Sequence, residues 1–305
     1  MAKSPPNEPL KPGFRLTRYV IQRKLSAGGF GVVYLALRED GQPVAIKEFL
    51  PSMMSCRPQL QKGWVEPKSP VDKRRFREGL ETFFKEADTL SKIHDDRVIA
   101  VWDVFEAHGT AYFVMPVERG NTLQAAIRSS PMGLDYTSLR NIFIQAAHGV
   151  EVLHRHGLLH LDLKPSNLWL RPDQSVVVLD LGASRWTDEE GNANQLARTP
   201  GFAAPEQHGK VQVKDLTVRT DVYGLSATLY ASLEGHPPPQ ASVRRPHDPP
   251  LAQQRLGQHP TGLLQLIDQG MHLNPQERFS SVQQWREALE KIPKAMPARK
   301  YTDPL

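Results

Sequence analysis

The 305-residue chain is short of cysteine and of long hydrophobic runs. Its single cysteine, Cys56, excludes an internal disulfide and favours a reducing compartment. No run approaches the roughly 20 apolar residues that a membrane-spanning helix needs. Residues 1–13 also lack the hydrophobic core of a secretory signal peptide, and their prolines predict a flexible arm. We therefore expect this segment to be cytoplasmic, with no membrane partner.

The chain also lacks a dense block of charge of one sign. Its net charge is +5, and the positive residues are scattered rather than interleaved with aromatic residues. The densest basic cluster, residues 73–75, is typical of the solvated start of a helix. A nucleic-acid partner is therefore not expected, whereas the mildly basic balance suits acidic ligands such as phosphates.

The order of predicted strands and helices indicates the fold class. One segment of the first part, residues 72–93, repeats apolar residues at helical spacing. From residue 121 onward helical patterns dominate, and five strands with one helix before a helical half predict a two-lobed α+β fold. The predicted strands are residues 19–25, 31–38, 43–49, 99–107 and 110–117, and the main later helices are residues 138–157, 222–235 and 280–292.

Composition divides the chain into lobes and connecting segments. Two proline-containing stretches, residues 51–72 and 236–250, are expected to be loops, and the first is an insertion in the first lobe. The predicted divisions are an arm at 1–13, a first lobe at 14–116, a second lobe at 117–293 and a tail or linker at 294–305.

Three glycines separate the first two predicted strands. Gly28, Gly29 and Gly31 lie in "LSAGGFGVVYLA", and glycines there let backbone N–H groups approach phosphates closely. A tight hairpin turn would use the same residues. A dinucleotide-binding fold is disfavoured, because its glycines lead into a helix rather than a strand.

Further motifs follow the glycines in a fixed order. Lys47 ends "VAIK" on an otherwise apolar strand, where by itself it would be interpreted as a solvent-facing lysine. Then come Glu86 on the predicted helix, "HLDLKPSN" at 160–167, "DLG" at 180–182 and "APE" at 204–206. Agreement of six elements in this order is not expected by chance.

On these motifs the chain resembles the bacterial eukaryotic-like (Hanks-type) Ser/Thr protein kinases over residues 14–292. The resemblance implies a two-lobed kinase fold, with a five-stranded antiparallel sheet and one helix in the first lobe and a mainly helical second lobe. It also implies transfer of the γ-phosphate of ATP to Ser or Thr hydroxyls of protein substrates, with Mg²⁺ as the metal and Mn²⁺ as a substitute.

The resemblance assigns ATP-binding roles to matching residues. Lys47, held by Glu86, would grip the α- and β-phosphates, and Asp180 and Asn167 would hold the metal. Trp169 would be either the floor of the adenine pocket or part of the lobe core. The implied ATP-binding residues are Ser26, Ala27, Gly28, Gly29, Phe30, Gly31, Val33, Ala45, Lys47, Met115, Pro116, Val117, Glu118 and Trp169.

The transfer step and its control are assigned in the same way. Asp162 would orient the substrate hydroxyl and accept its proton, and Lys164 would contact the γ-phosphate. Thr187 and Thr199 would lie in the activation segment as candidates for autophosphorylation, which would involve a transient homodimer. Two further residues would form a structural ion pair: Glu206 and Arg278.

Structural roles are expected at three other positions. Asp221 would cap the catalytic segment through its backbone N–H groups, and His160 would pack behind "DLG". His154 has no metal-ligand spacing with acidic or thiol partners, so we expect it on the surface of a helix.

Three positions depart from the family pattern. Ser26 replaces the first glycine of the phosphate loop, and Leu181 replaces the usual phenylalanine after the metal-binding aspartate. Leu161 replaces the arginine that precedes the catalytic aspartate in many kinases, which makes this a non-RD loop. Without that arginine, an activation-segment phosphate lacks its usual partner, so we expect catalysis not to depend on it.

Two other functions were weighed against an active protein kinase. A pseudokinase scaffold would have lost one of the four charged or metal-binding groups, and all four are present: Lys47, Asp162, Asn167 and Asp180. A small-molecule kinase is disfavoured by the "APE" segment and by the proline-rich stretch at 236–250, which resemble a protein-docking lobe.

Overall fold

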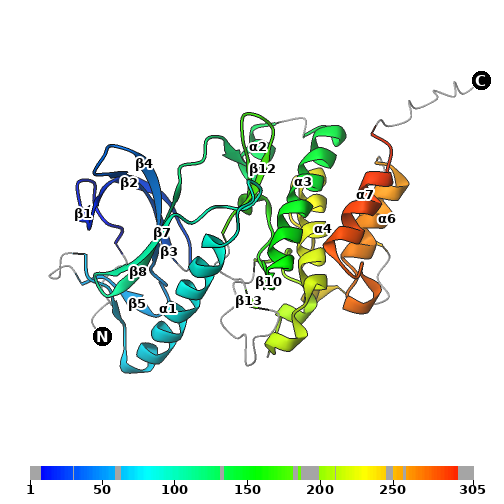
Figure 1. Ribbon diagram of the computed structural model, residues 1–305. Coiled ribbons are helices and arrows are strands. Elements are labelled where there is room, and N and C mark those ends of the chain that lie inside the picture. The colour runs from blue at the N-terminus through cyan, green and yellow to red at the C-terminus, as the bar shows by residue number, and fades with distance from the viewer. Residues whose placement is uncertain are drawn as a thin grey trace, which may run out of the picture. The chain divides into compact units, whose positions relative to one another are not determined.

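An antiparallel sheet with one long helix, and a separate group of helices, make up the two units of this computed structural model (Figure 1). The first unit ends at Arg119 and the second begins at Gly120. Within the described part of the chain, no helix has both the length and the apolar character needed to cross a membrane. The structure describes residues 8–29, 31–58, 63–130, 134–180, 199–209, 211–244, 250–256 and 259–294, and the backbone of 185–186.

The sheet of the first unit has six strands in the order β1-β2-β3-β4-β8-β7, all antiparallel. Its five longer strands lie within or over the five predicted runs, although β7 begins at Asp103 and not at residue 99, and the two-residue β1 adds a sixth at one edge. So short a strand has no alternating pattern by which the sequence could reveal it. The strands are β1 (Arg15–Leu16), β2 (Tyr19–Ala27), β3 (Gly31–Arg38), β4 (Pro43–Phe49), β7 (Asp103–Ala107) and β8 (Thr110–Pro116).

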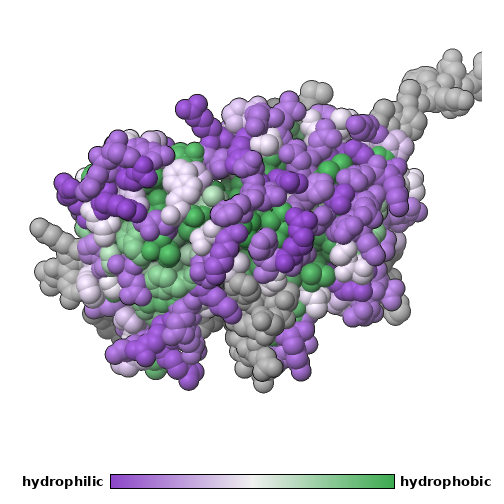
Figure 2. Space-filling model, viewed as in Figure 1, coloured by the Kyte–Doolittle hydropathy of each residue, from purple (hydrophilic) through white to green (hydrophobic). Residues whose placement is uncertain are grey.

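Helix α1 (Pro70–Ser91) packs on one face of this sheet, starting two residues before the predicted helix. Ser69 caps its first turn through the side-chain oxygen. Phe76 and Phe83 pack on Phe49 of β4, with ring centroids 5.4 and 5.6 Å apart. Figure 2 shows that the other side of α1 is hydrophilic and faces solvent. The aromatic contacts therefore orient the helix against the sheet.

The insertion at 51–72 is more ordered than its composition predicts. Strand β5 (Ser55–Cys56) pairs antiparallel with β6 (Glu66–Pro67), and α1 already begins at Pro70. The prediction of a plain loop was therefore wrong in part, because two-residue strands leave no periodic pattern among the prolines. Residues 59–62 lie outside the described ranges.

The second unit is mainly helical, as predicted. The three predicted helices are present as α3, α4 and α7, and the described residues also form α2, α5 and α6, which were not predicted. Of the latter, α2 has seven residues and α5 five, too few to show helical periodicity clearly. The α-helices are α2 (Leu123–Ser129), α3 (Tyr136–Arg155), α4 (Val218–Glu234), α5 (Leu251–Arg255), α6 (Thr261–Gly270) and α7 (Val282–Lys291).

Helix α4 is the buried centre of the second unit. Its residues from Thr220 to Ser232 are all buried, and Ser226 Oγ accepts a 2.8 Å hydrogen bond from Trp285 Nε1 of α7. A Cβ on Gly270 of α6 would lie 1.9 Å from the same Oγ, so the helices approach too closely for a larger residue. The proline-rich 236–250 stretch was predicted to lack regular structure, yet it contains a 3₁₀ turn at Ala241–Val243. Residues 245–249 lie outside the described ranges.

Short strands hold the segment between α3 and α4 in place. Strand β11 (Leu168–Leu170) pairs with β12 (Val176–Val178) on one side and with β9 (Asn121–Thr122) on the other. Strand β10 (Leu158–Leu159) pairs with β13 (Arg185–Trp186). The "HLDLKPSN" segment therefore lies between two anchored strands, β10 and β11, and includes the 3₁₀ turn Pro165–Asn167.

Candidate active site

Lys47 and Glu86 lie in contact in the first unit. Lys47 is on β4 with 8% of its surface exposed, and its Nζ is 3.5 Å from Oε1 of Glu86 on α1. The ammonium also lies over the ring of Phe113, 5.1 Å from the centroid. A buried ammonium is costly without such partners. These two contacts explain how β4 accommodates a buried lysine.

The glycine-rich turn joins β2 to β3. Gly28 N donates to Gly31 O at 2.9 Å, which closes the turn across Gly29. A Cβ added to Gly28 or Gly29 would meet nothing within 4 Å, so the space beside both residues is open. Gly31 differs, because a Cβ there would lie 2.0 Å from the carbonyl oxygen of Glu48. Ser26 and Ala27 end β2, and Phe30 is outside the described residues.

Several predicted adenine contacts share one face of the sheet. Val33 is paired with Lys47, and Ala45 with Met115, in the antiparallel register. Directly paired residues point to the same side of a sheet, and so do residues two apart along a strand. These four side chains therefore lie on one face, and the segment that follows Met115 consists of half-buried Pro116, exposed Val117 and half-buried Glu118.

Trp169 belongs to the second unit. It is half-buried on β11, where it is paired with Val177 on one side and Thr122 on the other. A Cβ on Gly120 would come within 3.1 Å of its indole Nε1. Gly120 has a positive φ of 126°, so both its conformation and its closeness to β11 require glycine.

Asp162, Lys164 and Thr199 form a closed polar cluster in the second unit. Lys164 Nζ lies 2.5 Å from Asp162 Oδ2 and donates to Thr199 Oγ1 at 3.0 Å. The hydroxyl of Thr199 donates to Asp162 Oδ1 at 2.7 Å. Asp162 is 8% exposed, so its carboxylate meets these groups in a largely dry setting. In this cluster the Asp162 carboxylate accepts a hydrogen bond from a hydroxyl group, and the Lys164 ammonium lies beside both groups.

Asn167 and Asp180 carry the side-chain oxygens of the candidate metal site. Asn167 Nδ2 donates to the carbonyl oxygen of Asp162 at 2.8 Å, which fixes the orientation of its side-chain oxygen. Leu179 N donates to Asn167 O at 2.9 Å and so brings the residue before Asp180 next to Asn167. Asp180 is exposed and has a positive φ of 58°, a conformation that aspartate tolerates.

The donor set suits a cation that keeps much of its water. One carboxylate and one amide oxygen match Mg²⁺, which binds few protein ligands and completes its shell with water and phosphate. In the part of the chain that the structure describes, no cluster of three His, Cys, Asp or Glu residues forms a self-sufficient metal site.

Asp221 of α4 anchors the backbone of the "HLDLKPSN" segment, residues 160–167, which is called the catalytic segment below. Its Oδ2 accepts the N–H of His160 at 2.8 Å and lies 2.7 Å from Nε2 of His154, and its Oδ1 accepts the N–H of Leu161 at 2.7 Å. Burial favours a raised pKa for the Asp221 carboxyl, but the contacts with His154 and the charges of His154 and His160 lower it below the ordinary value. The expected capping role of Asp221 is thus visible as hydrogen bonds.

His160 connects the catalytic segment with the residues before Asp180. Its Nε2 bonds to Leu179 O at 3.0 Å, and its Nδ1 accepts the N–H of Asp162 at 3.3 Å. The ring is fully buried, so it has a packing role. His154, by contrast, was interpreted as a helix-surface residue, and its contact with Asp221 shows that this was wrong.

Leu161 is buried and held in an uncommon backbone conformation. Its φ is +63°, and only 4% of its surface is exposed. It belongs to an apolar cluster with residues of the 211–218 stretch, and its carbonyl oxygen accepts a 2.8 Å hydrogen bond from Gln207 Nε2. Gln207 was not predicted, because a glutamine after "APE" gives no sequence signal. The apolar cluster consists of Leu159, Leu161, Val211, Val213 and Leu216, with Val218 against it.

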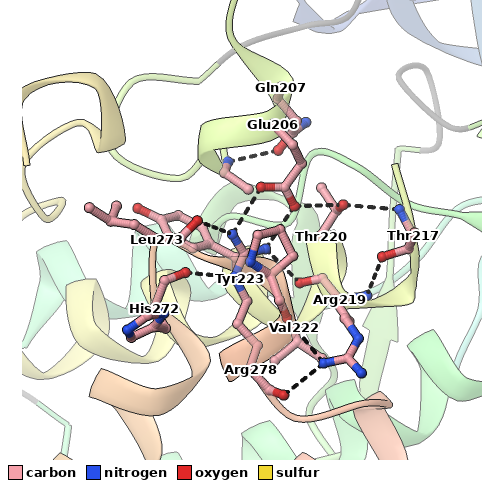
Figure 3. A network of polar contacts seen from close by, with 12 residues as sticks. Glu206, Gln207, Thr217, Arg219, Thr220, Val222, Tyr223, His272, Leu273 and Arg278 are labelled. Carbon is pink, nitrogen blue, oxygen red and sulfur yellow. Dashed lines mark hydrogen bonds and ion pairs between the residues drawn. The ribbon is translucent and has the colours of Figure 1, made fainter. Parts of the chain in front are cut away.

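Glu206 and Arg278 are in contact through two parallel bonds (Figure 3). Arg278 Nη1 lies 2.7 Å from Oε1 of Glu206, and Nη2 lies 2.9 Å from Oε2. Thr220 donates to Oε1 at 2.9 Å, and the Arg278 side chain is 0% exposed. Arg278 also lies over the ring of Tyr223. The pair joins the segment after Thr199 to the stretch between α6 and α7, and Thr220 links the same carboxylate to α4. Thr187 lies outside the described residues.

Comparison with known proteins gives one consistent family. A sequence model described as "Protein kinase domain" matches residues 19–291. "Serine/threonine-protein kinase PknD" of Mycobacterium tuberculosis is 29% identical over 282 residues, which cover 88% of this chain and 39% of the relative. "Probable serine/threonine-protein kinase zyg-1" of Caenorhabditis elegans is 28% identical over 75% of this chain and 29% of its own length. The chain thus spans well under half of these relatives.

Solved structures agree with the sequence relatives. The structure "PpkA-294 apo form" has a TM-score of 0.78 and 27% identity, and the match covers 93% of this chain and 99% of that one. The kinase domain of Mycobacterium tuberculosis PknI, solved as a point mutant, has a TM-score of 0.67 at 22% identity, and the match covers 93% of this chain and 98% of that one. The second comparison supports the fold alone.

Proposed function

Because this chain belongs to the protein kinase domain family, we propose that it transfers the γ-phosphate of ATP to Ser or Thr hydroxyls of protein substrates. Its mycobacterial and nematode relatives are named Ser/Thr kinases. The spacing of "HLDLKPSN" and the fold likeness to the PpkA structure support the same activity for this chain.

The contact between Thr199 and Asp162 is the observation that carries the proposal. Thr199 presents an alcohol to Asp162 Oδ1 at 2.7 Å, within the distance at which a general base must meet its proton. A serine or threonine of a substrate is the same kind of alcohol. Lys164, 2.5 Å from Oδ2, supplies a positive charge where a transferred phosphate would carry negative charge.

The first unit would bind the nucleotide. Phosphoryl transfer depends on positioning and on neutralising negative charge rather than on covalent catalysis. In the first unit, Lys47 held by Glu86 suits the α- and β-phosphates, and the open turn at Gly28 and Gly29 leaves room for them. The adenine ring of ATP would lie on the sheet face that carries Val33, Ala45 and Met115.

Asn167 and Asp180 would hold Mg²⁺ in this reaction. When bound, the metal would neutralise the negative charge of the phosphates. The hydrogen bond from Asn167 Nδ2 to Asp162 O would hold the side chain of this metal ligand in a fixed position relative to Asp162. Mn²⁺ has the same preference for oxygen ligands and should substitute.

The direct test is phosphate transfer from labelled ATP with Mg²⁺ to mixed protein and peptide acceptors. Wild-type protein should label Ser and Thr, and Asp162→Asn should abolish transfer while Mg²⁺–ATP still binds. Binding without any transfer by the wild type would instead indicate a scaffold. Labelling of small molecules but of no protein would indicate a small-molecule kinase.

Autophosphorylation in trans is part of the proposal, since one protein chain can be the substrate of another copy. Mixing wild-type protein with the Asp162→Asn variant should label the inactive copy through a transient homodimer. Labelling confined to the active copy would show that transfer occurs within one chain.

A further inference from the structure

Glu48 follows Lys47 on β4 and lies on the opposite face of the sheet. Successive residues of a strand point to opposite faces, so Lys47 faces α1 and Glu48 faces away from it. Glu48 has 0% of its surface exposed. A carboxylate in such a place is costly unless charged or hydrogen-bonding groups surround it.

Three side chains surround the Glu48 carboxylate. Tyr34 of β3 donates to Oε2 at 2.6 Å, and Tyr112 of β8 donates to Oε1 at 2.7 Å. The guanidinium of Arg57 pairs with Oε1 as well. Burial raises the pKa of Glu48 above its ordinary value, even though Arg57 and the two tyrosines act in the other direction. The cluster ties β4 to both neighbouring strands and to the 51–67 segment.

Arg57 is the junction of this cluster. It is 6% exposed, and its Nε donates to Gly63 O at 3.1 Å while its Nη1 donates to Glu8 O. The side chain of Arg57 therefore links Glu48 to Gly63 within the insertion and to Glu8 in the N-terminal segment. That segment also reaches the cluster directly, because Leu10 N donates to the hydroxyl of Tyr34 at 3.0 Å.

The same insertion reaches the glycine-rich turn. The N–H of Ser52 donates to the carbonyl oxygen of Gly29 at 3.1 Å. The hydroxyl of Ser52 lies 3.5 Å from the same carbonyl oxygen. One short segment thus contacts both the strand that carries Lys47 and the turn that would cover the phosphates.

We propose that residues 51–58 and 63–67 form an internal brace for ATP binding, in which Arg57 acts through Glu48 as a positioning residue for Lys47. The inference rests on the proposed function, because it concerns the same ATP site. Apolar side chains of similar volume would fill this space with at least equal stability. A buried ion pair with fixed hydrogen-bond directions instead holds β4, and with it Lys47, in one position.

The decisive variant is Arg57→Met combined with Glu48→Gln. The single Arg57→Met change leaves a buried charge without its partner and can prevent folding, whereas the double change removes both charges and keeps an amide for the two tyrosines. We expect the Kd for Mg²⁺–ADP, measured by calorimetry, to rise by about tenfold, with a matching rise in KM for ATP. The KM for a peptide substrate should not change.

Two further measurements separate positioning from simple stabilisation. Amide exchange at Ser52 should accelerate in the double variant, because the turn at Gly29 is no longer held. Arg57→Lys, which keeps the charge but loses the planar fork, should give an intermediate Kd and decides the question if the double variant does not fold. Arg18→Met is the matched control, since it breaks an exposed pair with Asp103 in the same unit and should leave the Kd unchanged.

The brace is overturned if the double variant has a lower melting temperature than the wild type yet binds Mg²⁺–ADP as tightly. If the double variant does not fold, the same result for Arg57→Lys overturns it. Wild-type protein that binds Mg²⁺–ADP but transfers no phosphate would remove the proposed function, and the binding comparison would still test the brace. Wild-type protein that binds no nucleotide would overturn both.

Discussion

The side-chain amide of Gln207 donates a 2.8 Å hydrogen bond to the carbonyl oxygen of Leu161, the residue before Asp162. Leu161 is also held from the other side, because its N–H is bonded to Asp221. Its side chain is buried with Val211, Val213 and Leu216. Hydrogen bonds and apolar packing therefore fix the catalytic segment at this position without any phosphate.

Catalysis should accordingly be independent of phosphorylation between Asp180 and Glu206. An arginine in place of Leu161 would need a phosphate to balance its charge, whereas the leucine is already packed. We expect protein treated with a phosphatase to keep its activity toward a peptide within about twofold. Mass spectrometry should verify complete dephosphorylation, and a collapse of activity would show that the apolar cluster is insufficient.

The hydroxyl of Thr199 should contribute to turnover by holding Asp162 and Lys164 in place. Thr199→Ala removes both hydrogen bonds, and we expect kcat to fall by about tenfold with little change in KM for ATP. Thr199→Ser keeps the hydroxyl and serves as the matched control. Equal activity of the alanine and serine variants would assign Thr199 no part in the reaction.

Asp221 should make stability depend on pH in the acid range. Its pKa is lower in the folded protein than the ordinary value of about 3.9, so its contribution is fully present above about pH 4 and is lost as pH falls through the folded pKa. Asp221→Asn removes this contribution. In urea unfolding, the stability difference between wild type and variant should narrow from about pH 5 to about pH 3. A difference that stays constant would contradict the assignment.

The Glu206–Arg278 pair should be costly to break from one side. Arg278→Met leaves the Glu206 carboxylate buried without its partner, and we expect a loss of about 3–5 kcal/mol in the free energy of unfolding. Combining it with Glu206→Gln should recover part of that loss. Lys92→Met, which breaks an exposed pair with Asp88, should cost less than about 1 kcal/mol. Similar losses in the free energy of unfolding for Arg278→Met and Lys92→Met would contradict this prediction.

Much of the fold followed from local patterns in the sequence. The strands around Lys47 are short β-branched or aromatic runs punctuated by glycine, aspartate or charged residues, and the helix around Glu86 repeats apolar residues at helical spacing. The short helix α2 and the strands β5 and β6 were missed, because seven or two residues carry too little of either pattern. The polar residues of the candidate site were proposed from ordered motifs and a family resemblance rather than from periodicity.

Contacts between distant segments were the part that could not be predicted. The link between Glu48 and Arg57 needs the insertion to fold back over β4, and the composition of residues 51–72 indicated only a loop. Gln207 and His154 likewise gain their roles from Leu161 and Asp221, which are distant in sequence. Nothing local distinguishes such residues from ordinary surface residues, so only the tertiary structure reveals them.

The two kinds of glycine in the phosphate turn have different evolutionary consequences. Gly28 and Gly29 border open space, so no packing contact in the described structure requires glycine there, whereas a bound phosphate would. Gly31 is required by the carbonyl oxygen of Glu48, 2.0 Å from where its Cβ would lie. A descendant of this protein that lost nucleotide binding should therefore vary at the first two glycines and retain the third. Gly31 alone is a marker of the fold and not of the activity.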